Sequence, residues 1–183
     1  AFYLKIPVGH VEAGLRTYNI NSPFPEEFNR QITSKIATFH FAPTNQAKKN
    51  LLEEGVDKKK IFVTGNTIVD SLEMIREKAK AQEFPQDILE DLPFLKNNEY
   101  KDIILITGHR RENFGEGFKE ICLGLRDIAI EFKDHKLVYP LHLNPNVVGP
   151  ANSILGGIEN IYLIKPVEYL VFIKLMQVAK LVI

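Results

Sequence analysis

The chain has 183 residues, which is enough for one ordinary domain or for parts of two. Apolar residues make up 45% of it, so the chain can form a substantial core and is not expected to be disordered. Lys plus Arg and Asp plus Glu both number 23, so the formal net charge is zero. This balance argues against a general nucleic-acid or membrane-surface binder, which normally has a basic excess.

The single cysteine, Cys122, allows no intrachain disulfide and favours a reducing, cytoplasmic setting. It lies in an apolar helical pattern, so a buried structural thiol is expected. No apolar run reaches the about 20 residues that cross a bilayer, and no membrane partner is expected. The chain begins without methionine and stops in a strand-like segment at 180–183, which predicts a fragment lacking both ends.

Strand-like and helix-like segments alternate in the first part of the chain. Strands are predicted at 2–11, 39–42 and 61–64, and helices at 25–37, 45–54 and 67–80. In the first helix, Phe28, Ile32 and Ile36 recur every four residues and define one apolar face. Thr44 is a suitable N-cap for the second helix, and Gly55 is its natural end.

Residues 82–100 contain Pro85, Pro93 and several charges, and they predict a connection with little regular structure and one short helix at 87–91. The expected domain boundary lies between Gly65 and this segment. Residues 1–66 are expected to form the last part of one Rossmann-like domain, and residues 67–183 a second one.

The second half continues the alternation, with strands predicted at 102–107, 136–139, 161–164 and 180–183 and helices at 118–132 and 168–179. Four adjacent apolar residues in the first of these strands indicate burial on both faces. The inward face of the first helix is expected to consist of Phe118, Ile121, Leu125, Ile128 and Phe132. The β-α-β succession predicts an α/β fold with parallel sheets.

Ligands of open parallel sheets bind beyond the carboxyl ends of the strands, and three groups of polar residues follow predicted strands. In the first group, Ala13 and Gly14 would let the backbone approach a ligand closely behind Glu12. Arg16 could hold a phosphate or a carboxylate with two hydrogen bonds. A solvated loop with an ion pair from Glu12 to Arg16 is an equal alternative.

The second group begins with Gly108 and His109 and is followed by a helix, which is a suitable layout for a phosphate. His109 can bind an anion or act as a general acid, and Arg110 adds positive charge; a surface turn is the alternative. In the third group, a turn histidine bonded to the backbone is the favoured interpretation of His142.

Two helix starts also carry candidate groups. Glu26 and Glu27 occupy a first helical turn, where the helix dipole explains at least one carboxylate and a general base could explain the other. Phe172 could face a nucleotide base, although core packing is the default. The scattered histidines and the absence of a cysteine pair argue against a metal site.

Five blocks together resemble the signature of the non-hydrolysing UDP-N-acetylglucosamine 2-epimerases. They are HVEAGLRT at 10–17, SPFPEEFNR at 22–30, TGNT at 64–67 with Asp70, TGHRREN at 107–113 and YPLHLNPN at 139–146. The blocks follow the family's order and spacing over nearly the whole chain, and their combination is highly specific.

The resemblance implies two Rossmann-like domains of the glycosyltransferase-B type, with the site between them. It implies interconversion of UDP-N-acetylglucosamine and UDP-N-acetylmannosamine by anti elimination of UDP to a 2-acetamidoglucal and re-addition of UDP. No redox cofactor is implied. The product would supply N-acetylmannosamine units for bacterial cell-surface polysaccharide, and the full-length enzyme would be a homodimer that binds UDP-N-acetylglucosamine and UDP.

The family's functional residues carry over to matching positions. Glu12 and Glu26 match the catalytic carboxylates, His109 matches a histidine at the UDP phosphates, and Phe172 matches a residue of the uracil pocket. Arg110 is a further candidate UDP contact. Regions that match the family's second, allosteric site for UDP-N-acetylglucosamine contain Arg110, His142 and Glu27 to Arg30.

These roles fit the chemistry, because removal of the weakly acidic C2 proton needs a carboxylate base and expulsion of UDP needs positive charge. A further catalytic aspartate of the family would precede Ala1, and its Asp-Ser-Gly-Gly block would follow Ile183, so these residues alone are expected to be inactive. Two alternatives are a glycosyltransferase of the same fold and a non-catalytic nucleotide-sugar binding module.

Overall fold

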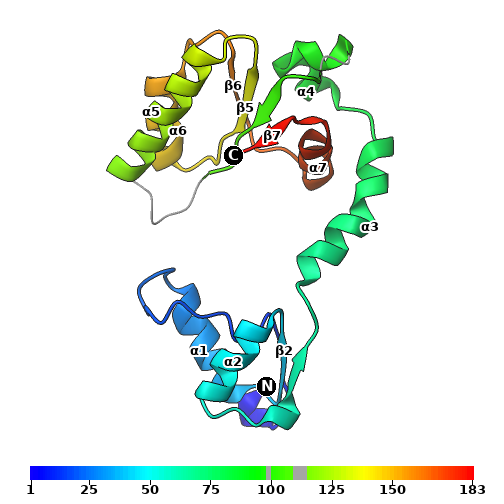
Figure 1. The fold of residues 1–183 in the computed structure, drawn as a ribbon, viewed down its shortest axis with the longest axis vertical. Coiled ribbons are helices and arrows are strands. Elements are labelled where there is room, and N and C mark those ends of the chain that lie inside the picture. Colours follow the sequence, from blue (N-terminus) through cyan, green and yellow to red (C-terminus); the bar gives the residue numbers. More distant parts are fainter. Residues whose placement is uncertain (98–99, 109–114) are drawn as a thin grey trace. The chain divides into compact units, whose positions relative to one another are not determined.

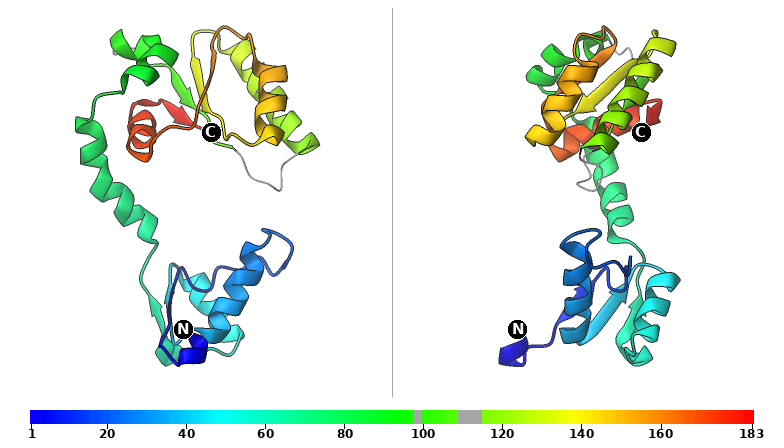
Figure 2. Two further views of the ribbon diagram at one scale, coloured as in Figure 1. Left: turned by 180° about the vertical axis from the view of Figure 1, so that it is seen from behind. Right: turned by 90° about the vertical axis from the view of Figure 1, so that its left-hand side faces the viewer.

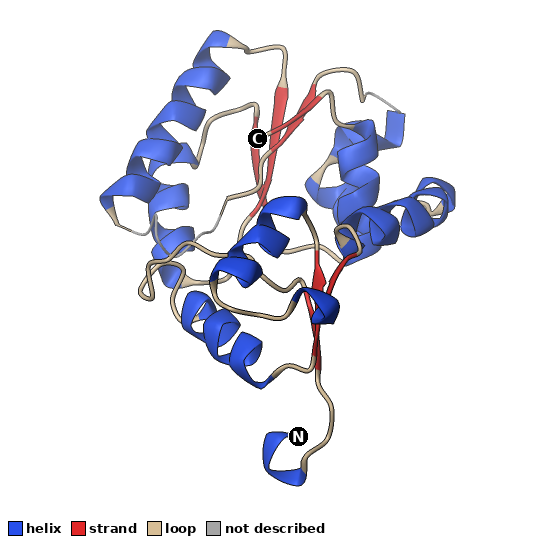
Figure 3. Cartoon of the chain, turned by 60° about the horizontal axis from the view of Figure 1, so that its bottom comes forward, coloured by secondary structure: helices blue, strands red, loops and turns tan. Residues whose placement is uncertain are grey.

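The computed structural model describes residues 1–97, 100–108 and 115–183 of the chain. It divides into two compact units, Ala1–Ser71 and Leu72–Ile183, each with its own sheet and its own helices (Figures 1 and 3). His109 and Arg110 lie outside the described residues. Within the part of the chain that the structure describes, no helix has the length and apolar character needed to cross a membrane.

The first unit is built around three parallel strands in the order β1-β2-β3. Its elements in chain order are a 3-10 helix (Phe2–Leu4), β1 (Gly9–Val11), α1 (Glu26–Ile36), β2 (Phe39–Ala42), α2 (Asn45–Glu53), a 3-10 helix (Lys58–Lys60) and β3 (Ile61–Val63). The prediction of a strand over 2–11 is therefore wrong in its first part, where the chain forms a helical turn instead.

The start and end of α2 agree with its sequence signals. The Thr44 side-chain oxygen accepts a hydrogen bond from the Ala47 amide at 3.1 Å, as expected of an N-cap. Gly55 adopts a φ of 81° just beyond the helix, a conformation that glycine tolerates best. The chain then continues through β3 into α3 (Thr67–Ala81), in which the division between the two units falls.

Helices α1 and α2 lie on the same face of the first sheet (Figures 1 and 2). The core on this face is small and consists of Ala13, Ala42, Ala47, Leu51 and Ile61. The other face carries three phenylalanines whose rings contact one another, with centroids 5.8 Å apart for Phe41 and Phe62 and 6.4 Å apart for Phe39 and Phe62.

The predicted apolar face of α1 is not the buried face of this helix. Phe28, Ile32 and Ile36 are 46%, 48% and 37% exposed, whereas Glu27 and Ser34 are buried. The periodicity identified the helix correctly, but the side chains that α1 turns toward the rest of the unit are polar.

The second unit is built around four parallel strands in the order β6-β5-β4-β7. Its elements after α3 are α4 (Gln86–Asp91), a 3-10 helix (Pro93–Asn97), β4 (Ile103–Leu105), α5 (Glu116–Glu131), β5 (Lys136–Pro140), α6 (Pro145–Leu155), β6 (Ile161–Ile164), α7 (Tyr169–Val178) and β7 (Leu181–Val182). All three residues of β4 are buried, which confirms the prediction of a strand covered on both faces.

Helices cover both faces of this second sheet, with α5 and α6 on one side and α4 and α7 on the other (Figure 1). The α5 face includes Cys122, which is fully buried, as predicted. Burial raises the pKa of the Cys122 thiol, so the thiol stays protonated and inert.

The short helix predicted at 87–91 is confirmed by α4, and a 3-10 helix follows it. The described part of residues 82–100 also contributes Phe84, Ile88 and Leu92 to the core. Two expectations for this unit need correction. Helix α6 was not expected, since the Asn-Pro-Asn sequence indicates a turn; here Asn144 is the N-cap and the first proline occupies the first helical turn. The inward face of α5 contains Cys122 and Ala129 instead of two of the expected side chains, Ile121 (39% exposed) and Phe132 (50% exposed).

Candidate functional site

Glu12 lies directly beyond the carboxyl end of β1 and is exposed. Its φ of 60° places it in the left-handed region, which is unfavourable by about 1–2 kcal/mol for a residue with a side chain. The next residue is anchored, because the Ala13 amide donates to the Phe41 carbonyl at 3.0 Å and Ala13 is fully buried. An unfavourable backbone conformation held by ordered neighbours is a feature of functional positions.

The small residues behind Glu12 make room for a helix, and the predicted close approach of a ligand stays a prediction. Gly14 has a φ of 85°, and a Cβ at this position would lie 2.2 Å from the carbonyl oxygen of Ala47 in α2. The Gly14 carbonyl in turn accepts a hydrogen bond from the Asn50 side chain at 2.9 Å. The backbone after Glu12 is therefore packed tightly against α2.

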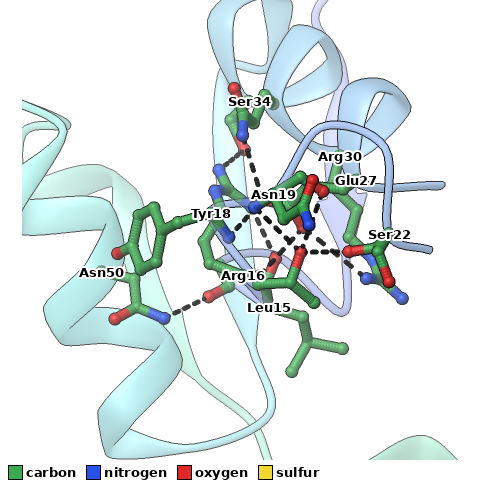
Figure 4. Close-up of polar contacts among 12 residues, drawn as sticks. Leu15, Arg16, Tyr18, Asn19, Ser22, Glu27, Arg30, Ser34 and Asn50 are labelled. Atoms are coloured by element: carbon green, nitrogen blue, oxygen red, sulfur yellow. Dashed lines mark hydrogen bonds and ion pairs between the residues drawn. The ribbon is translucent and has the colours of Figure 1, made fainter. Parts of the chain in front are cut away.

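Arg16 is bound on several sides within the first unit (Figure 4). Its side chain is fully buried, and its Nε and Nη2 atoms donate to the two oxygens of Glu54 at 2.6 and 2.9 Å. Nη2 also donates to the Ser34 hydroxyl at 2.9 Å. Arg16 therefore holds a carboxylate with two hydrogen bonds, and that carboxylate is Glu54. The alternative prediction, a solvated ion pair between Arg16 and Glu12, is wrong.

The two carboxylates at the start of α1 have different environments. Glu26 is exposed, whereas Glu27 is fully buried. Glu27 accepts hydrogen bonds from the backbone amides of Thr17 at 3.1 Å and Tyr18 at 3.2 Å. Burial alone would raise the pKa of Glu27, but hydrogen bonds from Gln31, Thr17 and Tyr18 and the charge of Arg16 lower it below its usual value.

Arg30 lies one turn further along α1, with its Nη1 atom 3.8 Å from a carboxylate oxygen of Glu27. This distance is that of an ion pair without a short hydrogen bond. Arg30 thus belongs to the same polar cluster as the loop that follows Glu12.

Two histidines are paired across β1 and β2. His10 and His40 occupy the same register, with ring centroids 6.5 Å apart, and the Nδ1 atom of each is buried with no hydrogen-bond partner among the described residues. Burial lowers the pKa of His40, and the charges of Lys60 and Arg16 lower it further. Burial, His40 and Arg16 likewise lower the pKa of His10.

In the second unit, Tyr139 fixes the turn beyond β4. Its hydroxyl donates a hydrogen bond to the carbonyl oxygen of Gly108, the last described residue before His109. Burial raises the pKa of Tyr139 to about 12, so the hydroxyl keeps the proton that this bond requires. The predicted phosphate contacts of His109 and Arg110 themselves lie outside the described residues.

The remaining candidates of the second unit follow β5 and β6. His142 is exposed, and its Nδ1 atom accepts a hydrogen bond from the Asn144 amide at 3.2 Å, as expected of a turn histidine. Phe172, in the first turn of α7, is partly buried against the core formed by α4, α7 and the sheet. The expectation of core packing is confirmed for Phe172, and its contact with uracil stays a prediction.

The structure therefore places Arg30 in one polar cluster of the first unit, beside Glu27. Glu12 and Glu26 are exposed; Glu12 precedes the loop that this cluster holds, and Glu26 precedes Glu27 in α1. Sequence reasoning missed the residues that build this cluster, above all Glu54 and Asn50, which are ordinary polar residues of α2 and its end. A buried role for Glu27 could have been suspected from its place beside a candidate base. Within the described ranges, no three His, Cys, Asp or Glu side chains lie close enough together to hold a metal ion.

Comparisons with known proteins bear on the family and the fold of this chain. The family model described as UDP-N-acetylglucosamine 2-epimerase matches residues 1–183. The chain is 50% identical to the UDP-N-acetylglucosamine 2-epimerase of Salmonella typhimurium, with all of this chain and 48% of the relative covered. It is also similar to the crystal structure of the Neisseria meningitidis UDP-GlcNAc 2-epimerase bound to UDP-GlcNAc, with a TM-score of 0.90 and 48% identity over 100% of this chain and 48% of that one.

A third relative is the Methanocaldococcus jannaschii UDP-GlcNAc 2-epimerase in complex with UDP-GlcNAc and UDP, at a TM-score of 0.74 and 35% identity over 100% of this chain and 49% of the other. The chain thus spans about half the length of the relatives that it matches. The predicted fold class, α/β with Rossmann-like parallel sheets flanked by helices, is confirmed. Because the family model covers every residue, the chain belongs to the UDP-N-acetylglucosamine 2-epimerase family.

Proposed function

We propose that the full-length protein carrying this chain interconverts UDP-N-acetylglucosamine and UDP-N-acetylmannosamine. The reaction removes the C2 proton of the sugar and expels UDP from C1, which leaves a 2-acetamidoglucal. UDP then adds back to C1 while C2 takes a proton on the opposite face. No electrons are exchanged with a cofactor, and the proton that leaves C2 is replaced from a protein group or from water.

The observation that carries this proposal is the placement of Glu12. Glu12 is exposed beyond a strand end, so its carboxylate is available to a substrate, and its left-handed backbone is anchored by the hydrogen bond of Ala13. Glu12 and Glu26 are the proposed proton-transfer groups, because a weakly acidic C–H bond requires a positioned base. His109 and Arg110 are proposed to bind the UDP phosphates, where positive charge favours the departing diphosphate.

The remaining assignments are proposed on the same basis. Phe172 would line the uracil pocket, and Arg30, Arg110 and His142 would contribute to an allosteric site for a second UDP-N-acetylglucosamine. The ligands named for the Neisseria and Methanocaldococcus relatives, UDP-GlcNAc and UDP, support these ligands for this protein. We further propose a cytoplasmic homodimer that supplies N-acetylmannosamine units for cell-surface polysaccharide.

The test is incubation of the full-length protein with UDP-N-acetylglucosamine alone in deuterated water. We expect deuterium at C2 of both nucleotide sugars, because the abstracted proton exchanges with solvent. A glycosyltransferase or a binding module would leave C2 unlabelled when no acceptor is present, and that result would refute the proposal.

The same assay tests the role of Glu12. Glu12→Gln should lower turnover about 100-fold or more, the scale of a lost general acid or base, while UDP still binds. The matched control is Glu53→Gln, which neutralises an exposed carboxylate of α2 that pairs with Lys49 at 3.8 Å. Turnover of Glu12→Gln equal to that of this control would show that Glu12 takes no part in proton transfer.

A further inference from the structure

Glu27 is a buried carboxylate that the proposed reaction does not use. It is fully buried in the first turn of α1, directly beside the exposed Glu26. A buried charge is unfavourable unless hydrogen bonds or an opposite charge compensate for it. Its partners therefore show what this carboxylate stabilises.

The two backbone amides that Glu27 binds lie outside its own helix, while Gln31 and Arg30 of α1 are its other partners. Oε2 accepts from the amide of Thr17 at 3.1 Å and Oε1 from the amide of Tyr18 at 3.2 Å, while Gln31 of α1 donates to Oε1 at 3.0 Å. A carboxylate in a first helical turn ordinarily serves the amides or the dipole of its own helix. Here both oxygens instead bind successive amides of the loop that follows Glu12 (Figure 4).

The loop between Glu12 and Tyr18 is also held at two earlier points. Gly14 is bound to Asn50 of α2, and Arg16 is bound to Ser34 of α1 and to Glu54. With Ala13 bonded to β2, the whole stretch after Glu12 is attached to the sheet and to both helices. Glu27 supplies the last attachment, and it is the one closest in sequence to Glu26.

From these contacts we propose that Glu27 is a positioning residue that sets the placement of Glu12 relative to Glu26. The backbone of Glu27 belongs to the same helical turn as Glu26. Its side chain binds two amides of the loop that follows Glu12. The inference rests on the proposed function, in which these two carboxylates exchange protons with C2 of one sugar. Misplacement of a reacting group by about 1 Å can lower a rate about 100-fold.

The decisive variant is Glu27→Gln in the full-length protein. Glutamine has almost the same size, but only one of its two terminal atoms accepts hydrogen bonds, so the amides of Thr17 and Tyr18 can no longer both be held. We expect kcat to fall about 10- to 100-fold while KM for UDP-N-acetylglucosamine changes less than about threefold, the pattern of an interaction that matters in the transition state. Glu53→Gln is the matched control and should keep the wild-type kcat.

A second variant covers the case in which Glu27→Gln does not fold. Glu27→Asp keeps the charge and both acceptor oxygens but is one methylene shorter, so its hydrogen bonds to the loop amides should be longer and weaker. We expect a kcat between those of the wild type and Glu27→Gln at an unchanged KM. Thermal unfolding of every variant is measured, and kinetics are recorded well below the midpoint. A lower midpoint with wild-type kcat in the folded variants would show a purely structural role and would overturn the proposal.

The activity of the wild-type protein separates the positioning role of Glu27 from the proposed function. If wild-type protein neither epimerises the substrate nor incorporates deuterium, the function is wrong and the positioning role falls with it. If the wild type is active and both Glu27 variants match its kcat, only the positioning role is wrong.

Discussion

At the residue scale, the first unit contains two kinds of charged side chain: buried ones that stabilise the fold and exposed ones that a substrate can reach. Arg16 and Glu27 are buried and bonded to neighbours, whereas Glu12 and Glu26 are exposed. A buried charge that lost its partners would destabilise the protein by about 3–5 kcal/mol, so such residues are unsuited to repeated proton transfer. The exposed carboxylates are free of this constraint.

His40 makes the stability of the first unit depend on pH. Its pKa is lowered in the folded protein from 6.5, so below that pH the unfolded chain binds a proton that the folded protein resists. The free energy of unfolding should therefore decrease as pH falls through 6.5 toward the folded pKa, and the stabilisation is complete above 6.5. Urea unfolding between pH 7.5 and pH 5.5, followed by hydrogen exchange of the amides of β2, measures this change.

His40→Gln removes the titrating ring and should flatten this dependence without abolishing it, since His10 has a lowered pKa for similar reasons. A slope of stability against pH that is the same in His40→Gln and in the wild type would contradict the assignment.

At the scale of the elements, the first unit is held together by close backbone contact as much as by its small apolar core. The core contains three alanines, so few large side chains lie between the sheet and α2. The small side chains leave room for the carbonyl of Ala47 to approach Gly14. The position of α2 is therefore sensitive to a methyl group added at Gly14.

A pair of glycine variants separates this contact from backbone strain. Gly14 and Gly55 have similar positive φ values, 85° and 81°, but a Cβ would meet the Ala47 carbonyl only at Gly14, while no atom lies within 4 Å of it at Gly55. Gly55→Ala should cost about 1–2 kcal/mol for the conformation alone. Gly14→Ala should cost about 1–3 kcal/mol more, because the overlap must be relieved by a backbone shift.

Denaturant unfolding of the two full-length variants measures the difference. Equal losses of stability would show that α2 moves freely away from Gly14 and that the close approach contributes nothing.

At the scale of the whole molecule, each unit carries a core of its own. In the second unit the segment after α3 contributes Leu92, which is fully buried against the sheet. Leu92→Ala should destabilise this unit by about 2–5 kcal/mol, the usual effect of emptying a buried leucine site. Hydrogen exchange should show faster opening of β4 and β5, with the amides of β2 in the first unit unchanged.

The matched control for this experiment is Leu143→Ala, because Leu143 is 71% exposed and its truncation should change stability by less than about 0.5 kcal/mol. Faster exchange in β2 to the same degree as in β4 would mean that the two units unfold together.

Local signals in the sequence were sufficient for most elements. The bounds of β2 and β6 and the cap of α2 at Thr44 follow from residues that are adjacent along the chain. The family, too, is readable from the sequence, because its motifs are short blocks that keep their order. Helix α6 was missed because Asn-Pro-Asn favours a turn and Pro150 is unfavourable inside a helix, and packing of Val147 and Ala151 against α5 outweighs that preference.

By itself, the sequence determined the α/β alternation and the family. Only the tertiary structure decided which charges are buried, since Arg16 meets a partner 38 residues away and Glu27 bonds to amides nine and ten residues earlier. Periodicity and capping depend on neighbours within about one helical turn, whereas burial of a charge depends on which distant groups the fold brings to it.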